Sequence, residues 1–257
     1  MDETTDLIRG RTALVTGASR GIGAAAAAAL ARAGAARVLI HYGAYREGAE
    51  ATLAAVRGHG SDGDLLQADL ETAEGIRQFV AHLKQHARRI DVLINNAGSL
   101  LKRAKLVEYT EDLYDRVMNL NVKSVLFITQ ALAPHMIGQG SGAIVNVSSI
   151  SARTGGGAGS TVYSSAKAAI SCMTKGLSKE LAPLGIRVNA VSPGTVDNHF
   201  HEQFSTREKL DEVRGSTPAG TLGTNDEVAD VIVFLCSAGA RFIHGQTIEV
   251  NGGTFMI

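Results

Sequence analysis

Residues 16–23 read TGASRGIG, and this short stretch decides the fold class. It follows the apolar, β-branched run TALVT (12–16) and leads into AAAAAALARAG (24–34), so the order is strand, glycine turn, helix. Glycine allows a tight turn and a close approach of the backbone, and a helix N-terminus offers free N–H groups to an anion. This order favours the phosphate-binding turn of a nucleotide-binding protein, with a plain turn and close helix packing as the alternative.

Strand-like and helix-like segments alternate along the rest of the chain. Runs that are apolar on both faces and separated by helices are typical of a parallel sheet covered on both sides. We therefore predict one α/β domain over 1–257, a doubly wound (Rossmann) sheet of seven mostly parallel strands. The predicted strands are 12–16, 37–42, 64–68, 91–94, 143–147, 186–191 and 246–250, and the predicted helices are 22–33, 46–57, 73–88, 111–137, 161–182 and 225–238.

Composition argues against several classes of function. The 25 basic and 25 acidic residues cancel, so no bulk field draws the chain to nucleic acid or to an acidic membrane. The longest apolar runs fall short of the roughly 20 residues that span a bilayer, and the polar, acidic N-terminus MDETTDLIRG is unlike a signal peptide. Two cysteines, Cys172 and Cys236, and eight scattered histidines predict no disulfide and no metal site. A cytoplasmic protein is the expectation.

A second stretch, VYSSAKAAI at 162–170, carries one phenol and one ammonium among small and apolar residues. In a helix, Tyr163 and Lys167 lie one turn apart on the same face. A free tyrosine has a pKa of about 10, and a nearby ammonium favours the phenolate and lowers that pKa. The pair therefore predicts a proton donor beside its tuning cation, in preference to a core tyrosine with an unrelated lysine.

Several motifs together resemble the short-chain dehydrogenase/reductase family. TGASRGIG, NNAG (95–98), the set Ser149, Tyr163 and Lys167, and the pair Pro193–Gly194 follow one another in the family's order and cover essentially the whole chain. The resemblance implies an NAD(P)-dependent oxidoreductase that acts on CH–OH donors or on the corresponding carbonyls. Within the family, the chain resembles 3-oxoacyl-carrier-protein reductases and sugar or polyol dehydrogenases about equally.

The resemblance also implies roles for four candidate catalytic residues. Ser149, at the end of the strand AIVNV, would hydrogen-bond the substrate oxygen and stabilise charge on it, and Ser148 is its competitor. Asn121, in MNLNV, matches a helix asparagine that holds a proton-relay water. Lys167 would hold the nicotinamide ribose in addition to tuning Tyr163.

The end of the second predicted strand bears on the choice of nicotinamide cofactor. Proteins of this fold that prefer NAD usually carry Asp or Glu there to hold the ribose 2′-hydroxyl. This strand ends His41-Tyr42-Gly43, with Tyr42 where the acid would sit, so no carboxylate repels the 2′-phosphate of NADP. Arg20, in the glycine turn, can pair with that phosphate through two hydrogen bonds, with Arg46 as a second candidate. The sequence favours NADP and leaves NAD possible.

The resemblance extends these arguments to a full cofactor site. Asp69 and Leu70 should frame the adenine, although Asp69 is equally well placed to cap the helix 73–88. Family members usually carry Thr at the position of Asn198, which puts that contact in doubt. The predicted cofactor contacts are Gly17, Ser19, Arg20, Gly21, Ile22, Gly23, Tyr42, Asp69, Leu70, Asn96, Ala97, Gly98, Tyr163, Lys167, Pro193, Gly194 and Val196.

Residues 196–222, here named the lid segment, are long and polar and follow the sixth predicted strand. Loops in that position carry function, so we expect this segment to cover the substrate. Phe200 and Phe204 give it an apolar side. His199 and His201 are candidate polar contacts to the substrate, with mobile surface histidines as the alternative.

The substrate class is argued from the absence of basic residues. Docking of an acidic carrier protein calls for arginines on the rim of the site. Where relatives that dock such a protein place arginines, this chain has Pro134 and Leu184, and 134–144 contains no Lys or Arg. A small diffusible carbonyl or alcohol is therefore the preferred substrate, with a 3-oxoacyl-carrier-protein reductase as the alternative. A catalytically inactive NADP-binding regulator is disfavoured, because all four candidate catalytic positions are intact.

The predicted helices 111–137 and 161–182 carry more apolar and small residues than one sheet face needs. Relatives pair these two helices across a two-fold axis and add a second axis at the C-terminal strand. The resemblance thus implies a homotetramer, in which the C-terminal NGGTFMI (251–257) belongs to an interface.

Overall fold

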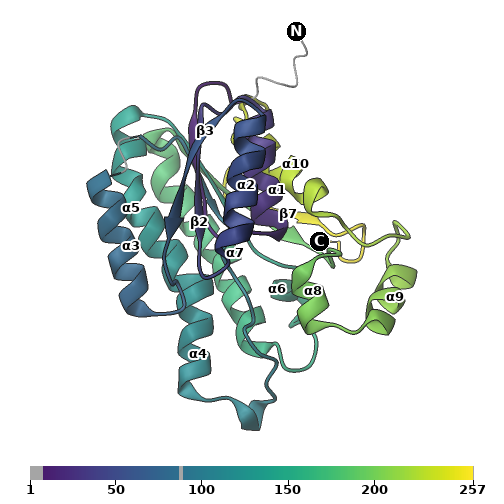
Figure 1. The fold of residues 1–257 in the computed structure, drawn as a ribbon. Coiled ribbons are helices and arrows are strands. Elements are labelled where there is room, and N and C mark those ends of the chain that lie inside the picture. The colour runs from purple at the N-terminus through teal and green to yellow at the C-terminus, as the bar shows by residue number, and fades with distance from the viewer. Residues whose placement is uncertain (1–7, 87–88, 257) are drawn as a thin grey trace.

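One parallel sheet organises the molecule (Figure 1). The computed structural model describes residues 8–86 and 89–256. In these residues seven strands pair in the order β3-β2-β1-β4-β5-β6-β7, and every pairing is parallel. The predicted doubly wound α/β fold is confirmed. The strands are β1 Thr12–Val15, β2 Arg37–Tyr42, β3 Asp62–Gln67, β4 Val92–Asn95, β5 Gly142–Val147, β6 Ile186–Pro193 and β7 Thr247–Val250.

Helices cover both faces of the sheet, as Figure 1 shows for α1 and α2 on one side and α3 and α5 on the other. The first layer packs the small residues of α1 and the apolar residues of α10 into one core cluster with β1, β2 and β4. The second layer buries residues of α3 and α5 against the opposite face. The helices are α1 Gly21–Arg32, α2 Arg46–Gly58, α3 Ala73–His86, α4 Glu111–Met118, α5 Ser124–Gln139, α6 Ser151–Thr154, α7 Thr161–Leu181, α8 His199–Phe204, α9 Arg207–Ser216 and α10 Asn225–Cys236.

The predicted helix 111–137 differs from the structure in its middle. A π-helical turn, Asn119–Lys123, separates α4 from α5. Such a turn widens the helix locally and re-aims the side chains around it, and it is frequent at functional sites. Here it carries Asn121, whose side chain is completely buried. Periodicity alone predicted one continuous helix, because the helical residues of α4, the π turn and α5 follow one another without a gap.

The lid segment is held at both of its ends. An isolated parallel bridge joins Val196 to Gly223, and the Asp197 N–H donates to the Gly223 carbonyl at 2.9 Å. Between these points the chain forms α8 and α9, which lie beside each other at the lower right of Figure 1. The lid segment therefore consists of two short helices whose flanking residues, Val196 and Gly223, are paired with each other.

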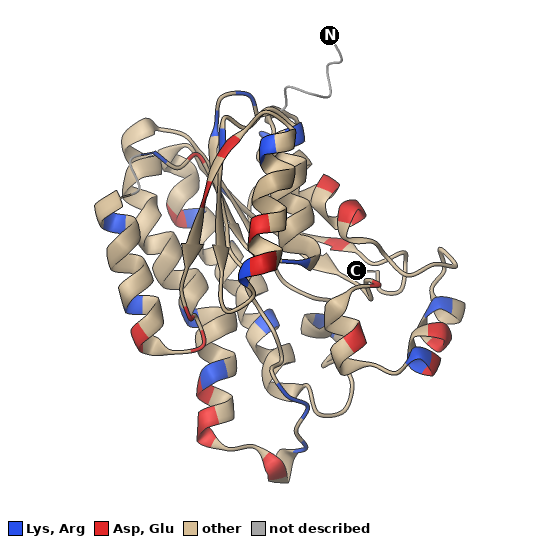
Figure 2. Cartoon of the chain, in the orientation of Figure 1, with Lys and Arg blue, Asp and Glu red and all other residues tan. Residues whose placement is uncertain are grey.

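Acidic and basic residues are interspersed along the chain, as the red and blue segments of the ribbon in Figure 2 show. In the two described ranges, no helix combines the length and the apolarity needed to cross a membrane. Most of the N-terminal stretch that was argued to be unlike a signal peptide, 1–7, lies outside the described residues. So do 87–88, which end a predicted helix, and the last residue of the predicted C-terminal interface.

Candidate active site

A cavity of about 410 Å³ opens at the carboxyl ends of the strands. It spans the point where the strand order reverses between β1 and β4, which is where doubly wound sheets bind their ligands. Most of the predicted site residues line it. Three do not, namely Gly23, Tyr42 and Asn121. Those that line it are Gly17, Ser19, Arg20, Gly21, Ile22, Asp69, Leu70, Asn96, Ala97, Gly98, Ser149, Tyr163, Lys167, Pro193, Gly194 and Val196.

The glycine turn brings the backbone close to its neighbours. Gly17 has φ +65° and Gly21 has φ +60°, the left-handed region that favours glycine. A Cβ on Gly17 would lie 2.8 Å from the Ala97 Cα, and a Cβ on Gly23 would lie 2.4 Å from the Gly17 carbonyl oxygen. Gly23 thus packs α1 behind the turn, while Gly21 begins the helix and faces the cavity. This cradle suits a pyrophosphate at the helix N-terminus.

The stretch NNAG supports the glycine turn from β4. The Asn96 side-chain amide donates to the carbonyls of Thr16 at 2.9 Å and Gly17 at 3.0 Å. In return the Thr16 hydroxyl accepts from the backbone N–H groups of Asn96 at 2.9 Å and Ala97 at 3.0 Å. These bonds cross-link two neighbouring strand ends, so the asparagine shapes the cavity wall in addition to lining it.

Two adjacent serines follow β5, and the structure separates their environments. Ser148 is buried, and its hydroxyl contacts the Lys167 carbonyl at 2.9 Å and the Ser171 hydroxyl at 2.8 Å. Ser149 lines the cavity, and its hydroxyl is close enough to the Tyr163 phenol to lower the pKa of that phenol. The geometry therefore favours Ser149 over Ser148 as a partner of the substrate oxygen.

Burial dominates the protonation of the tyrosine–lysine pair. Burial of its hydroxyl raises the pKa of Tyr163 to about 12, against a smaller lowering by the Ser149 hydroxyl. Burial likewise lowers the pKa of Lys167 to about 8. The Lys167 Nζ lies 5.7 Å from the Tyr163 ring centroid and donates to the Val147 carbonyl at 2.8 Å. The predicted lowering of the phenol pKa by the ammonium is therefore wrong for this structure, because desolvation is the larger effect.

Asn121 lies behind the cavity wall on the π-helical turn. Its side-chain amide donates to the carbonyls of Ser99 and Val117, both at 2.8 Å. Its carbonyl oxygen is buried and has no hydrogen-bond partner in the described part of the chain. A Cβ built on Gly98 would lie 2.7 Å from both this oxygen and the Lys167 Nζ. An unpaired amide oxygen facing a lysine ammonium across a glycine is a suitable acceptor for one ordered water.

The adenosine end of the predicted site needs a correction at Tyr42. Tyr42 packs into the core beneath α2 and is 6% exposed. His41, its neighbour in β2, lines the cavity in its place. Arg46 is also turned away from the cavity, because its Nε donates to Glu50 at 2.8 Å. Arg20 remains as the predicted cation that lines the wall.

Of the two roles considered for Asp69, the structure favours lining the cavity over capping α3. Its carboxylate accepts from the Glu71 N–H at 2.9 Å and lines the wall together with Leu70. The alternative role, capping of α3, belongs to Thr72, whose hydroxyl accepts from the Gly75 N–H at 3.0 Å.

Sequence reasoning missed two residues at this end of the cavity. His41 Nδ1 accepts from the Gly17 N–H at 3.1 Å, and its Nε2 lies 3.2 Å from the Ala68 carbonyl. Burial lowers the pKa of His41 to about 4, so the ring is neutral and carries its proton on Nε2. Tyr45 lies under the guanidinium of Arg20, with 4.4 Å between Arg20 Cζ and the ring centroid. The presence of a histidine inside the largely apolar strand β2 was the signal that could have identified His41.

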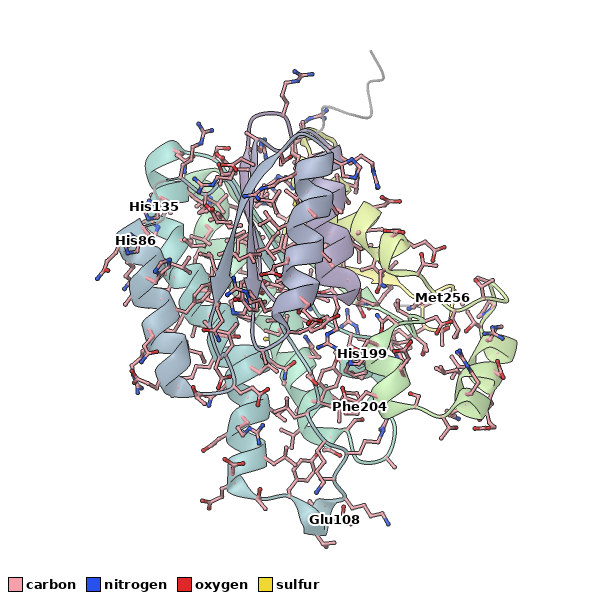
Figure 3. All side chains as sticks on the ribbon, in the orientation of Figure 1. His86, Glu108, His135, His199, Phe204 and Met256 are labelled. Carbon is pink, nitrogen blue, oxygen red and sulfur yellow. The ribbon has the colours of Figure 1, made fainter. Side chains whose placement is uncertain are left out.

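The lid segment supplies the wall opposite the strand ends. The Phe200 and Tyr163 ring centroids are 5.8 Å apart. Burial lowers the pKa of His201, with a smaller contribution from the charge of Arg103. Asn198 caps α8 by accepting from the Phe200 N–H at 3.1 Å, and it also faces the cavity. In Figure 3, the labels of His199 and Phe204 mark the two ends of α8. Both line the cavity, as do His201 and Gln203.

Metal-binding side chains do not gather here. Within residues 8–86 and 89–256 no group of three or more His, Cys, Asp or Glu could hold a metal ion.

Known proteins match this chain over nearly its full length. The model of a family described as enoyl-(acyl carrier protein) reductase matches residues 17–254. An uncharacterised oxidoreductase of Methylorubrum extorquens is 40% identical over 96% of this chain and 98% of its own. A 3-oxoacyl-[acyl-carrier-protein] reductase of Staphylococcus aureus is 36% identical over 96% of this chain and 98% of its own.

A solved structure also matches this chain over nearly its full length. The gluconate 5-dehydrogenase of Burkholderia cenocepacia, crystallised with NADP and tartrate, superposes with a TM-score of 0.87 at 32% identity, covering 98% of this chain and 97% of that one.

Proposed function

The chain belongs to the short-chain dehydrogenase/reductase family, and from this premise we propose that it is an NADP-dependent oxidoreductase for a small diffusible alcohol or carbonyl. One observation carries the proposal. Ser149 follows β5, Tyr163 and Lys167 lie on α7, and all three line one cavity beside the Pro193–Gly194 pair at the end of β6. A proton donor, a donor to the substrate oxygen and a cation are the groups that carbonyl reduction requires.

The residues of the cavity fit a nicotinamide dinucleotide. The cradle of Gly17 and Gly21 would hold the pyrophosphate, Asp69 and Leu70 the adenine, and Lys167 the nicotinamide ribose. When bound, the nicotinamide supplies or accepts the hydride. NADP is preferred over NAD because Arg20 lines the adenosine end and no carboxylate follows β2 there. The NADP-bound gluconate 5-dehydrogenase supports this choice.

We assign the proton to Tyr163. With a pKa of about 12 the phenol stays protonated at neutral pH, which suits donation to the oxygen of a carbonyl during reduction. The Ser149 hydroxyl donates a hydrogen bond to the same oxygen and holds it next to the phenol. Behind them, the free carbonyl oxygen of Asn121 would position a water that returns the proton to Tyr163 through Lys167.

The lid segment favours a small polar substrate. The Phe200 ring lies 5.8 Å from that of Tyr163, and Phe204 packs against Phe200 at 5.0 Å. His199, His201 and Gln203 line the same cavity and offer hydrogen bonds. A hydroxylated carbonyl compound uses both kinds of contact. The tartrate in the related gluconate 5-dehydrogenase, itself a hydroxy acid, is consistent with this class.

The second candidate is a 3-oxoacyl-carrier-protein reductase, which the name of the Staphylococcus aureus relative favours. A carrier protein would have to dock near the cavity through basic side chains. The two positions considered for such docking hold Pro134 and Leu184, both exposed and uncharged. We therefore rank this candidate second.

The experiment that tests the proposal is turnover of NADPH with a panel of 3-oxoacyl thioesters, hydroxylated ketones and cyclic ketones. We expect the highest kcat/KM at neutral pH with a hydroxylated ketone. A preference for a carrier-bound thioester would replace our substrate class with the second candidate. Tight NADPH binding without turnover of any panel member would favour an inactive regulator.

A further inference from the structure

Arg20 and Tyr45 form a stacked pair at the adenosine end of the cavity. The guanidinium carbon of Arg20 lies 4.4 Å from the centroid of the Tyr45 ring. Arg20 belongs to the glycine turn before α1, and Tyr45 precedes α2, so two separate elements meet here. Both side chains line the cavity, next to Gly43 and Ala44.

The chain makes room for the ring on its other side. A Cβ built on Gly48, in the first turn of α2, would lie 2.2 Å from the Tyr45 ring and 2.2 Å from the Ser19 carbonyl oxygen. Glycine is thus the residue that leaves the ring its place. The ring is seated between the start of α2 and Arg20, which restricts where the guanidinium can lie.

Stacking leaves the hydrogen-bonding capacity of Arg20 unused. The guanidinium carbon lies over the ring at 4.4 Å from its centroid. A cation held by the ring face keeps its N–H groups available as donors. Among the described residues no carboxylate or carbonyl accepts a hydrogen bond from the Arg20 side chain. Arg46, by contrast, is engaged by Glu50. An arginine held on an aromatic ring with its donors free is prepared for an anion that takes two hydrogen bonds.

We propose that Tyr45 is a positioning residue for cofactor specificity, because it holds Arg20 where the 2′-phosphate of NADP would bind. This inference rests on the proposed NADP dependence and adds to it a residue that neither the sequence nor the comparisons assign. The phosphate contact itself is made by Arg20. Tyr45 contributes by reducing the number of guanidinium orientations that binding must restrict.

The test uses two nucleotides that differ by one phosphate, 2′,5′-ADP and 5′-AMP, with binding to the full chain measured by calorimetry. Tyr45→Ala should weaken 2′,5′-ADP about 3- to 10-fold, the range expected when binding must immobilise one more long side chain. Its affinity for 5′-AMP should change by less than about twofold, which also reports that the variant is folded. Tyr45→Phe keeps the ring and should bind 2′,5′-ADP nearly as the wild type does.

A double-mutant cycle separates positioning from direct contact. In an Arg20→Ala background, Tyr45→Ala should cost less than about twofold in 2′,5′-ADP affinity. An undiminished effect in that background would overturn the inference, since Tyr45 would then act without Arg20. Equal loss of 5′-AMP and 2′,5′-ADP binding in Tyr45→Ala would overturn it as well.

The inference and the proposed cofactor choice fail in different ways. Should the wild-type chain bind 2′,5′-ADP no better than 5′-AMP, the NADP preference itself is wrong. Should the wild type prefer 2′,5′-ADP and Tyr45→Ala keep the full preference, NADP dependence stands and only the role of Tyr45 is lost.

Discussion

Tyr163 is the residue on which the proposed chemistry depends, and its removal is the first prediction. Tyr163→Phe keeps the ring that packs near Phe200 but removes the proton donor. General acid–base help is typically worth about 10²- to 10⁴-fold in rate, so kcat should fall by at least about 10²-fold. NADPH affinity, measured by fluorescence titration, should stay within about threefold of wild type.

The contrast with Lys167 sharpens that result. Lys167→Ala should lower both kcat and NADPH affinity, because the ammonium is proposed to hold the ribose and to pass the proton. Near-normal turnover of Tyr163→Phe on a good substrate would mean that the proton comes from another group.

His41 leads to a prediction about stability and pH. Its pKa is about 4 in the fold, against 6.5 when unperturbed. Between pH 4 and 6.5 the unfolded chain binds more protons at His41 than the folded chain does. The contribution of His41 to the free energy of unfolding is therefore complete above about pH 6.5 and is lost as the pH falls towards 4. The pKa shift corresponds to about 3 kcal/mol of unfolding free energy. Urea unfolding should show most of this loss when the pH is lowered from 7 to 4.5.

The matched comparison is His41→Gln. This variant should lose most of that pH dependence, whatever its stability at pH 7. His82→Gln, at an exposed position on α3, should keep the wild-type dependence. Parallel pH curves for wild type and His41→Gln would contradict the assignment of the slope to His41.

At β2, the sequence predicted the strand but not which of its residues faces the cavity. Neighbouring residues of a strand point to opposite faces, and of this pair only His41 lines the cavity. The comparison with an acidic residue pointed to Tyr42, whereas the structure buries Tyr42 in the core and turns His41 to the cavity. Tyr45 lies beyond the strand, where no periodicity indicates a direction.

At the scale of the elements, the glycine turn is the segment that leaves the least room for an added side chain. A Cβ at Gly23 would lie 2.4 Å from both the Asn96 amide nitrogen and the Gly17 carbonyl oxygen. Gly23→Ala should therefore displace the turn, destabilise the fold by about 1–3 kcal/mol and weaken NADPH binding at least about tenfold. Thermal unfolding and NADPH titration measure the two effects.

Gly58→Ala is the matched control, because a Cβ there meets nothing within 4 Å. It lies at the end of α2, where alanine should be neutral or stabilise by up to about 1 kcal/mol. If both variants behaved alike, the close packing around Gly23 would not be what limits the turn.

The strands and most helices could be predicted because their apolar runs directly reflect burial. β4 and β5 are buried at every residue, and both appear in the sequence as uninterrupted apolar segments apart from Asn95 and Asn146. The π-helical turn could not be predicted in this way. It lies where α4 and the turn itself pack against α7, and such tertiary contacts leave no periodic pattern in the chain.

At the scale of the whole molecule, we propose that 1–257 forms one domain, since all seven strands share one sheet. Apolar side chains nevertheless remain uncovered on the described surface. Phe242 is 96% exposed ahead of β7, and Met256 is 80% exposed after it. On α5, Leu126 and Ile137 are exposed as well. Exposed apolar side chains that cluster into a patch mark surfaces that contact another protein.

From these surfaces we predict the homotetramer that the family resemblance implies. Light scattering at micromolar concentration should give about four times the 26.9 kDa of one chain. Phe242→Asp, which charges the face beside β7, should reduce the assembly to a dimer by removing one of the two axes. A monomeric wild type at that concentration would contradict the prediction.

The bridge between Val196 and Gly223 has a consequence for how this architecture can acquire new substrates. Because the two ends of the intervening chain are fastened to each other, that chain forms a closed excursion from the sheet. An excursion of this kind can be exchanged as a module while the scaffold that carries the glycine turn stays unchanged. A chimaera that carries 197–222 of a relative should therefore inherit the relative's substrate range and keep this chain's own cofactor preference.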